Sequence, residues 1–331
     1  MKTCLVFGYG GLDNDVAFNV VEFYKELGFK TFYSDKLCCA DLLVVLRAND
    51  EVKDIKKYEF TQVHVYDYGG WYYDEFVKAV IDLDITYIFS TSEKIKEHVV
   101  QDLGFPESQF NIAFPPVHIP LWKEKIKEIK YNTVHIGNFK PVDPKDKYKN
   151  VFDQAIHHLK AHVWGNGWED VIEGQKYHGQ ADFYEVSSVY AKSKFALGFM
   201  YPFQRDTTFS GRFWHAPLNG CLLLSEPGIY TDIPGVIETD YTEGSLLEIM
   251  TKQYDREKVQ EEAILYWTQQ KESTKQLVLR VLPNTFDLQN GYEKKKAYII
   301  GSIVNKLSRY AYKNGLQKKL RAMRKTIKSH K

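Results

Sequence analysis

Apolar residues gather along the chain in short runs that alternate with segments of helical spacing. In the first third, the strand-like runs lie at residues 3–7, 31–34, 42–46, 62–66 and 86–90. Between the first two runs, one face of a predicted helix, which Gly28 ends, carries Val16, Val20, Phe23 and Leu27. Strands that alternate with helices in this way predict a parallel sheet with helices on its faces.

The same alternation begins again in the second half. The proline-rich segment 115–120 cannot be a central strand and predicts a passage between domains. The Lys- and Glu-rich segment 122–130 is expected to form a solvated linker helix. Further strands are expected at 133–136, 162–164, 195–200 and 221–224, with helices at 147–159 and 183–191. We predict an α/β protein with two Rossmann-like domains facing a cleft, at residues 1–120 and 121–290, followed by a C-terminal helical segment at 291–331.

Composition places the chain among globular proteins. Its 331 residues exceed a usual single core, and 44% of them are hydrophobic and 26% charged. No apolar run approaches the length of a membrane helix, and the chain opens on a strand-like run instead of a signal peptide. Four cysteines show neither metal-site spacing nor a disulfide framework: Cys4, Cys38, Cys39 and Cys221. We therefore expect a cytoplasmic protein with structural thiols.

Charge is distributed unevenly, although the net charge is only +1. Residues 293–331 hold thirteen Lys or Arg against a single acid, Glu293. Apolar stripes there predict two helices, of which 293–313 would pack back on the first domain. The basic stretch Lys318–Lys331 is expected to contact an anionic membrane surface, which would make the protein peripheral at the inner face of the membrane; nucleic acid is the less favoured partner.

The stretch around Arg212 predicts an anion site. Ser210 and Gly211 open a short helix, Gly220 ends it, and the apolar run 221–224 is expected to be a buried strand. Such a helix start presents free N–H groups, and Arg212 adds a full positive charge at the same place. A diphosphate fits these features best. An ordinary α/β unit with a solvated Arg212 is the alternative.

This stretch resembles a known signature. The pattern Ser210-x-Arg212-x-aromatic-x-Ala216, followed by Gly220 and an apolar strand, is similar to the nucleotide-sugar-binding signature of GT-B glycosyltransferases. The likeness is greatest to the spore-maturation-type and bacterial surface-polysaccharide families, over about residues 132–245. It implies that Ser210, Gly211 and Arg212 bind the donor diphosphate. The acid that usually binds the ribose is replaced by His215, whose imidazole can still hydrogen-bond a hydroxyl, and Glu226 is a substitute candidate.

The resemblance also implies the rest of the donor site. Lys140, on the turn that follows the strand at 133–136, would be the second cation on the diphosphate. Residues on three turns would contact the nucleoside: Gly137, Asn138, Trp164, Gly165, Asn166, His178 and Gly179. Without the resemblance, these segments are ordinary turns and Lys140 is a surface charge beside a proline-rich loop.

An acceptor pocket is expected in the first domain. Asp67 directly follows the strand at 62–66, where a carboxylate could take the proton of an acceptor hydroxyl. Aromatic and glycine residues suited to stacking and close approach of a sugar lie on two turns: Tyr68, Trp71, Tyr72, Gly10 and Gly11. In inverting GT-B enzymes that modify phage DNA, the catalytic base looks similar to Asp67. Asp13 is the second candidate base, and helix capping is the alternative role of both carboxylates.

These features together predict a glycosyltransferase that moves a sugar from a nucleotide-diphosphate sugar to a hydroxyl acceptor, which family likeness suggests is a glycan of a surface polysaccharide. We expect neither a metal nor a cofactor, because two cations can stabilise the leaving diphosphate. The alternatives are a DNA-modifying glycosyltransferase, a non-catalytic nucleotide- or sugar-binding protein, and an NAD-dependent dehydrogenase whose fingerprint has Asp13 in place of its third glycine. Asp-x-Asp pairs at 13–15 and 82–84 would suit a metal-dependent GT-A enzyme.

Overall fold

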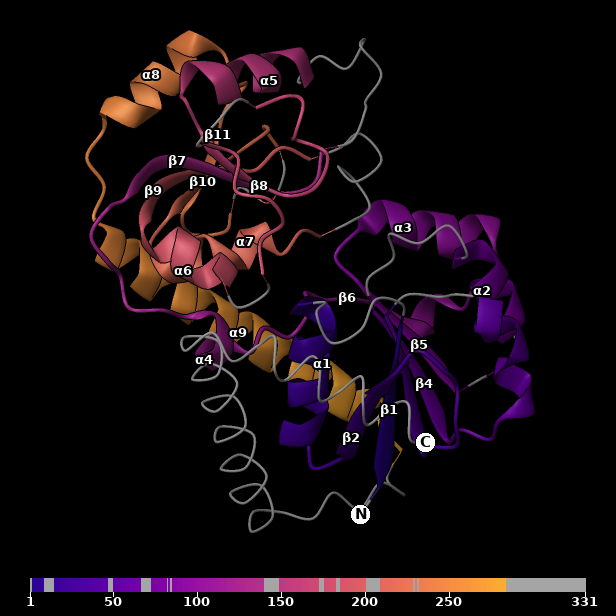
Figure 1. The fold of residues 1–331 in the computed structure, drawn as a ribbon. Helices are drawn as coiled ribbons and strands as arrows, with labels where there is room; N and C mark the ends of the chain where they lie inside the picture. The colour runs from indigo at the N-terminus through magenta and orange to yellow at the C-terminus, as the bar shows by residue number, and fades with distance from the viewer. Residues whose placement is uncertain are drawn as a thin grey trace, which may run out of the picture.

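The chain folds around two parallel sheets, which lie in separate halves of the molecule (Figure 1). This computed structural model describes residues 2–8, 15–46, 50–66, 73–81, 83, 85–139, 149–172, 176–182, 185–200, 209–228, 230 and 232–283. Within these ranges, six strands form the first sheet and five form the second. The predicted α/β class with two parallel sheets is thereby confirmed.

The first sheet has the order β2-β1-β3-β4-β5-β6. Its strands in chain order are Thr3–Phe7, Lys30–Ser34, Leu42–Val45, Gln62–Tyr66, Thr86–Ser90 and Phe110–Ile112. The second sheet has the order β11-β10-β9-β7-β8. Its strands β7 to β11 are Tyr131–Ile136, His162–Trp164, Ser193–Leu197, Leu222–Ser225 and Val236–Glu238. Every pairing in both sheets is parallel, so the carboxyl ends of the strands in each sheet meet at one edge.

Helices connect the strands and cover the sheets. In chain order, α1 to α9 are Asp15–Glu26, Tyr73–Val80, Glu93–Glu97, Ile119–Trp122, Lys149–His158, Glu185–Ala191, Arg212–His215, Glu243–Thr251 and Arg256–Val281. Helix α3 continues as a π-helical turn, and short 3₁₀ helices lie at Asp50–Lys57, Glu107–Gln109 and Pro217–Asn219. Among the helices within the described ranges, none is both long and apolar enough to cross a membrane. The predicted basic helices at 291–331, including Lys318–Lys331, lie outside the described residues.

The expected linker helix at 122–130 is wrong. Only Trp122 is helical, as the last residue of α4, and residues 123–130 run without regular structure. Their backbone groups bond to neighbouring elements, since the N–H of Lys127 donates to Ala191 O at 3.0 Å and that of Lys130 to Lys192 O at 2.8 Å. These tertiary hydrogen bonds take the place of helical ones. Helix propensity, which is worth only fractions of a kcal/mol per residue, is too weak to oppose them.

Helix α9 joins the two halves of the molecule (Figure 1). Near its start, the guanidinium of Arg256 donates to the carbonyl of Gly220 in the second domain, at 2.9 Å. Farther along, the hydroxyl of Thr274 donates to Phe114 O at 3.0 Å, and the ammonium of Lys271 pairs with Glu26 of α1. One buried apolar cluster also contains side chains from both sheets and from α9. The two domains therefore share part of their core.

A polar chain inside the first domain depends on an uncharged histidine. His64 of β4 is fully buried, its Nδ1 accepts from the Tyr24 hydroxyl, and its Nε2 donates to Gln62 Oε1 at 2.9 Å. The Gln62 amide donates in turn to the carbonyl of Val281 at the end of α9. Burial lowers the pKa of His64 to about 3, so the imidazole in this chain is uncharged near pH 7.

We expect this histidine to make the protein acid-sensitive. The unfolded chain binds a proton at His64 below about pH 6.5, whereas the folded protein does not until about pH 3. The contribution of His64 to stability is therefore present above pH 6.5. It is lost as pH falls towards 3, by up to about 1.4 kcal/mol per pH unit. Urea unfolding from pH 7 to pH 4.5 should show a shallower loss of stability in His64→Gln than in the natural protein.

The matched control is His157→Gln, because His157 lies exposed on α5. This control should keep the pH dependence of the natural protein. Parallel pH curves for His64→Gln and the natural protein would contradict the neutral, buried state of His64.

Candidate functional site

Strand order locates the candidate site. In the second sheet the chain passes from β7 to the edge strand β8, then returns to the other side of β7 to form β9. Ligands in open parallel sheets bind beyond the carboxyl ends of strands where the order reverses in this way. The segments that leave β7 and β9 at that edge begin at Gly137 and Gly198. A corresponding reversal between β1 and β3 lies in the first sheet.

The turns after β7 and β8 interlock. The N–H of Gly137 donates to Trp164 O at 2.8 Å, and the N–H of Asn166 donates to the side chain of Asn138 at 2.9 Å. Gly165 has a φ of 138°, and a Cβ there would lie 2.1 Å from the carbonyl oxygen of Gly137. Only glycine permits so close an approach. The structure thus brings together five of the residues predicted to surround the nucleoside.

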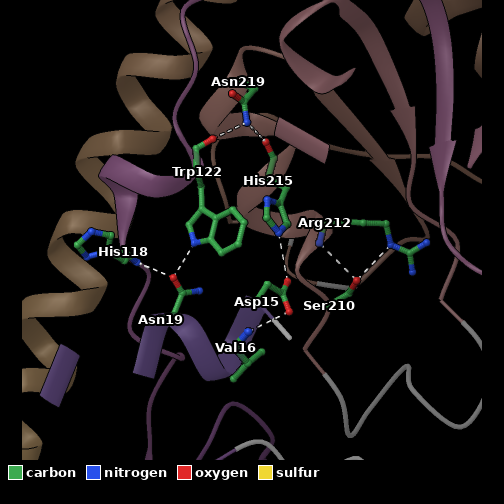
Figure 2. Close-up of polar contacts among 9 residues, drawn as sticks. All are labelled: Asp15, Val16, Asn19, His118, Trp122, Ser210, Arg212, His215 and Asn219. Atoms are coloured by element: carbon green, nitrogen blue, oxygen red, sulfur yellow. Dashed lines mark hydrogen bonds and ion pairs between the residues drawn. The ribbon is translucent and has the colours of Figure 1, made fainter. Parts of the chain in front are cut away.

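Arg212 joins this pair of turns to the signature stretch. Its Nε donates to Ser210 Oγ at 3.1 Å (Figure 2). Its Nη2 donates to Phe199 O, beyond β9, at 2.8 Å. Its Nη1 lies beside Gly137, 3.2 Å from the place a Cβ would take. No hydrogen bond joins Nη1 to any of the residues that the structure describes. One edge of the guanidinium is therefore anchored, while Nη1 faces the turn after β7.

The short helix at the signature forms as predicted. Helix α7 begins at Arg212, passes into the 3₁₀ helix Pro217–Asn219, and ends at Gly220, whose φ of 65° is left-handed. Strand β10 follows, and all four of its residues are buried. Of the predicted diphosphate-binding residues, Arg212 therefore lies beside Gly137, and the Ser210 hydroxyl contacts the Arg212 guanidinium.

The two candidate ribose partners are both enclosed by protein. His215 is 6% exposed, and its Nε2 lies 3.2 Å from Oδ2 of Asp15 in the first domain. Glu226 is fully buried, and its Oε1 accepts the N–H of Met200 at 2.9 Å. In this arrangement, a contact between a ribose and either side chain requires a rearrangement. Their roles in nucleoside binding stay predictions.

His178 and Gly179 lie along the edge strand β8. The His178 ring stacks on Trp164, with centroids 4.1 Å apart, and its Nε2 is 2.8 Å from Nδ1 of His162. The N–H of Gly165 donates to Gly179 O at 2.8 Å. Partial burial lowers the pKa of both histidines, with a smaller contribution from nearby positive groups. Both imidazoles are therefore neutral near pH 7, and Trp164 is covered by His178.

The other predicted site residues lie outside the described residues. They are Asp67, Asp13, Lys140, Gly10, Gly11, Tyr68, Trp71 and Tyr72. Their roles in catalysis, in diphosphate binding and in acceptor binding stay predictions. It also stays a prediction that Lys140 and Arg212 contact the same diphosphate.

Sequence reasoning missed two side chains beside the signature. Asp15 reads as the first residue of a helix, and nothing local indicates that it reaches His215, 200 positions away. His135 lies within β7, 3% exposed, and its Nδ1 donates to Leu197 O at 2.8 Å. Its Nε2 would be 3.1 Å from a Cβ at Gly137. The position of His135 near the end of a strand that precedes a glycine turn is the only signal that could have found it.

Comparison with known proteins agrees with this geometry. Residues 147–280 match the model of a family described as glycosyl transferase-like. No curated protein matches the chain by sequence. Solved structures similar to the chain include the DNA-modifying enzyme β-glucosyltransferase, at 12% identity and a TM-score of 0.57, covering 85% of this chain and 99% of that one.

Two further structures have the same TM-score. HepE of Anabaena, in complex with UDP-glucose, is 10% identical and the match covers 85% of this chain and all of that one. An α-glucosyltransferase in complex with UDP and a 13-mer DNA is 11% identical, with 85% and 99% covered. At these identities the likeness shows the fold, which is GT-B. The predicted resemblance to GT-B glycosyltransferases is confirmed, and the GT-A alternative is wrong because the chain has two separate sheets. The spore-maturation subtype stays a prediction.

The contact between the two turns yields a prediction for Gly165→Ala. Its Cβ would collide with the Gly137 carbonyl. We expect the free energy of unfolding to fall by about 3 kcal/mol or more. The control is Gly179→Ala, since Gly179 also has a positive φ, 73°, but no atom within 4 Å of a Cβ. This control should cost only about 1 kcal/mol. Equal losses in urea unfolding of the two variants would contradict the close approach.

Proposed function

We propose that this protein transfers a sugar from a UDP-sugar to a hydroxyl group of a glycan. The observation that carries the proposal is the guanidinium of Arg212, anchored at the strand-order reversal with Nη1 beside Gly137. The glycosyl transferase-like match at 147–280 includes Arg212, and the structures of similar fold include complexes with UDP-glucose and with UDP. These complexes favour uracil as the base of the donor.

The donor diphosphate would lie against Arg212 and Ser210. A guanidinium presents several N–H donors in a fixed plane that matches phosphate oxygens, and its charge does not titrate in proteins. Gly137 leaves its side of the site without a side chain, so a phosphate can approach the backbone. Lys140, three residues further along the chain, would supply the second positive charge. Both cations would stabilise the negative charge that grows on the leaving UDP.

The acceptor would be activated by a carboxylate of the first domain. Asp67 directly follows β4 in the sequence, and Asp13 is the second candidate. The carboxylate takes the proton of the acceptor hydroxyl as its oxygen bonds to the anomeric carbon. The bond from that carbon to the diphosphate oxygen breaks, and UDP leaves with the electron pair. Tyr68, Trp71 and Tyr72 would stack against the acceptor sugar, near the turn that holds Gly10 and Gly11.

Substitution of Arg212 tests the donor site. We expect Arg212→Ala to weaken UDP binding about tenfold or more in isothermal titration calorimetry, because a charge-assisted contact with phosphate is lost. Arg212→Lys keeps the charge without the planar fork, so its affinity should fall between the two. Arg280→Ala is the control, since Arg280 is exposed on α9. Unchanged UDP affinity in folded Arg212→Ala would contradict the proposed donor site.

Substitution of Asp67 tests the base. Asp67→Asn should lower kcat about 10²- to 10⁴-fold with little change in UDP affinity, because only proton transfer is removed. Asp13→Asn serves as the comparison that separates the two candidate bases. UDP release from UDP-sugars is the measurement. Wild-type turnover in Asp67→Asn with a loss in Asp13→Asn would assign the base to Asp13 instead.

The same assay identifies the acceptor class. Glycan acceptors and duplex DNA are compared, since two of the structures of similar fold belong to enzymes that act on DNA or bind it. Release of UDP only with DNA would replace the glycan proposal by DNA modification. Runs with and without a chelator test the proposal that cations of the protein serve in place of a metal.

A further inference from the structure

Two helical turns from different domains face each other beside the signature (Figure 2). Asp15 and Asn19 are four residues apart on α1, and His215 and Asn219 are four residues apart from α7 into the following 3₁₀ helix. Residues at this spacing lie on one face of a helix. Trp122 of α4 lies between the two turns (Figure 2). We call these five residues the interdomain joint.

Both carboxylate oxygens of Asp15 have partners. Asp15 Oδ1 accepts the N–H of Val16 at 2.9 Å, while Oδ2 lies 3.2 Å from His215 Nε2. The side chain of His215 is only 7% exposed and that of Asp15 is 27% exposed. Because both side chains are largely enclosed by protein, this contact differs from a mobile contact at the surface.

Trp122 and the two asparagines complete the joint. The indole N–H of Trp122 donates to Asn19 Oδ1 at 2.6 Å, and the Asn219 amide donates to the carbonyls of Trp122 and His215 at 3.0 and 2.7 Å. The rings of Trp122 and His215 are nearly perpendicular, with centroids 4.4 Å apart. The second ring nitrogen of His215 is buried without a hydrogen-bond partner among the described residues. Neither ring nitrogen of His215 is therefore open to a ligand.

Gly211 shows how closely Asp15 approaches the signature. A Cβ at Gly211 would lie 2.0 Å from Asp15 Oδ2. The backbone at Gly211 has φ −54° and ψ −22°, a helical conformation that alanine adopts without strain. Glycine is therefore needed at this position because of the Asp15 carboxylate. The backbone conformation of the turn itself would accept alanine.

We propose that Asp15 and His215 are positioning residues, which hold the diphosphate-binding turn of the second domain against α1 of the first. His215 then serves the interdomain joint and not the donor ribose. This inference rests on the proposed function, because it concerns the turn that begins with Arg212. A fixed distance between the two domains matters for transfer, since small displacements of reacting groups cost large factors in rate.

Single and double variants test these roles. UDP affinity and turnover are measured for Asp15→Ala, for His215→Ala and for the double variant. We expect each single variant to bind UDP within about threefold of the natural protein but to lower kcat about tenfold or more. The double variant should be no slower than the singles, because one shared interaction is lost. A selective loss of UDP affinity in His215→Ala, absent in Asp15→Ala, would assign His215 to the donor and overturn the proposal.

A second double-mutant cycle, of Gly211→Ala and Asp15→Ala, tests the interdomain joint without any substrate. Gly211→Ala should lower the Tm by about 3 °C or more in the natural background, because its methyl group displaces Asp15. In the Asp15→Ala background the same change should cost almost nothing. Gly244→Ala is the control, since a Cβ there meets open space. It should have the same effect in both backgrounds.

The two cycles separate the inference from the proposed function. An equal loss of Tm for Gly211→Ala in both backgrounds would overturn the contact between Asp15 and the signature turn. A natural protein that binds no UDP would remove the proposed function, while the Tm cycle would still decide whether the joint exists.

Discussion

The second domain depends on one close approach, between the turns that follow β7 and β8. The carbonyl of Gly137 occupies the space that any side chain at position 165 would need. That contact brings the two turns together at the strand-order reversal. Because Gly137 has no side chain, the guanidinium of Arg212 lies directly beside its backbone. The guanidinium can then reach three turns at once, through Ser210, Phe199 and Gly137. A charge placed this way is fixed before any ligand arrives, which is what electrostatic stabilisation of a leaving group requires.

The two domains are joined by three independent physical means. Apolar side chains of both sheets and of α9 form one buried cluster, so separating the domains would expose core surface to water. The neutral chain from Tyr24 through His64 and Gln62 to Val281 ties the first sheet to the end of α9. The interdomain joint adds polar contacts next to the signature. Because these contacts are spread along the whole junction, the domains are held at more than one point.

The interdomain joint also gives His215 a partner outside its own domain. His215 stands at the position just before Ala216, and the carboxylate beside it comes from Asp15 of the other domain. The acidic side chain beside the signature therefore comes from the first domain. Gly211 belongs to the same contact, because a side chain at this position would occupy the space of the Asp15 carboxylate.

By itself, the sequence determined the local features of this protein. Strand runs, the first helix with its apolar face, the glycine that ends the signature helix and the two-sheet class follow from periodicity and backbone preference, which act over a few residues. The extended course of 123–130, the enclosure of Glu226 and the pairing of His215 with Asp15 were decided only by tertiary structure. In each case the deciding group comes from far along the chain, as Ala191 does for Lys127. Local pattern carries no information on which distant carbonyl or carboxylate will arrive, because that depends on how the two sheets and α9 pack.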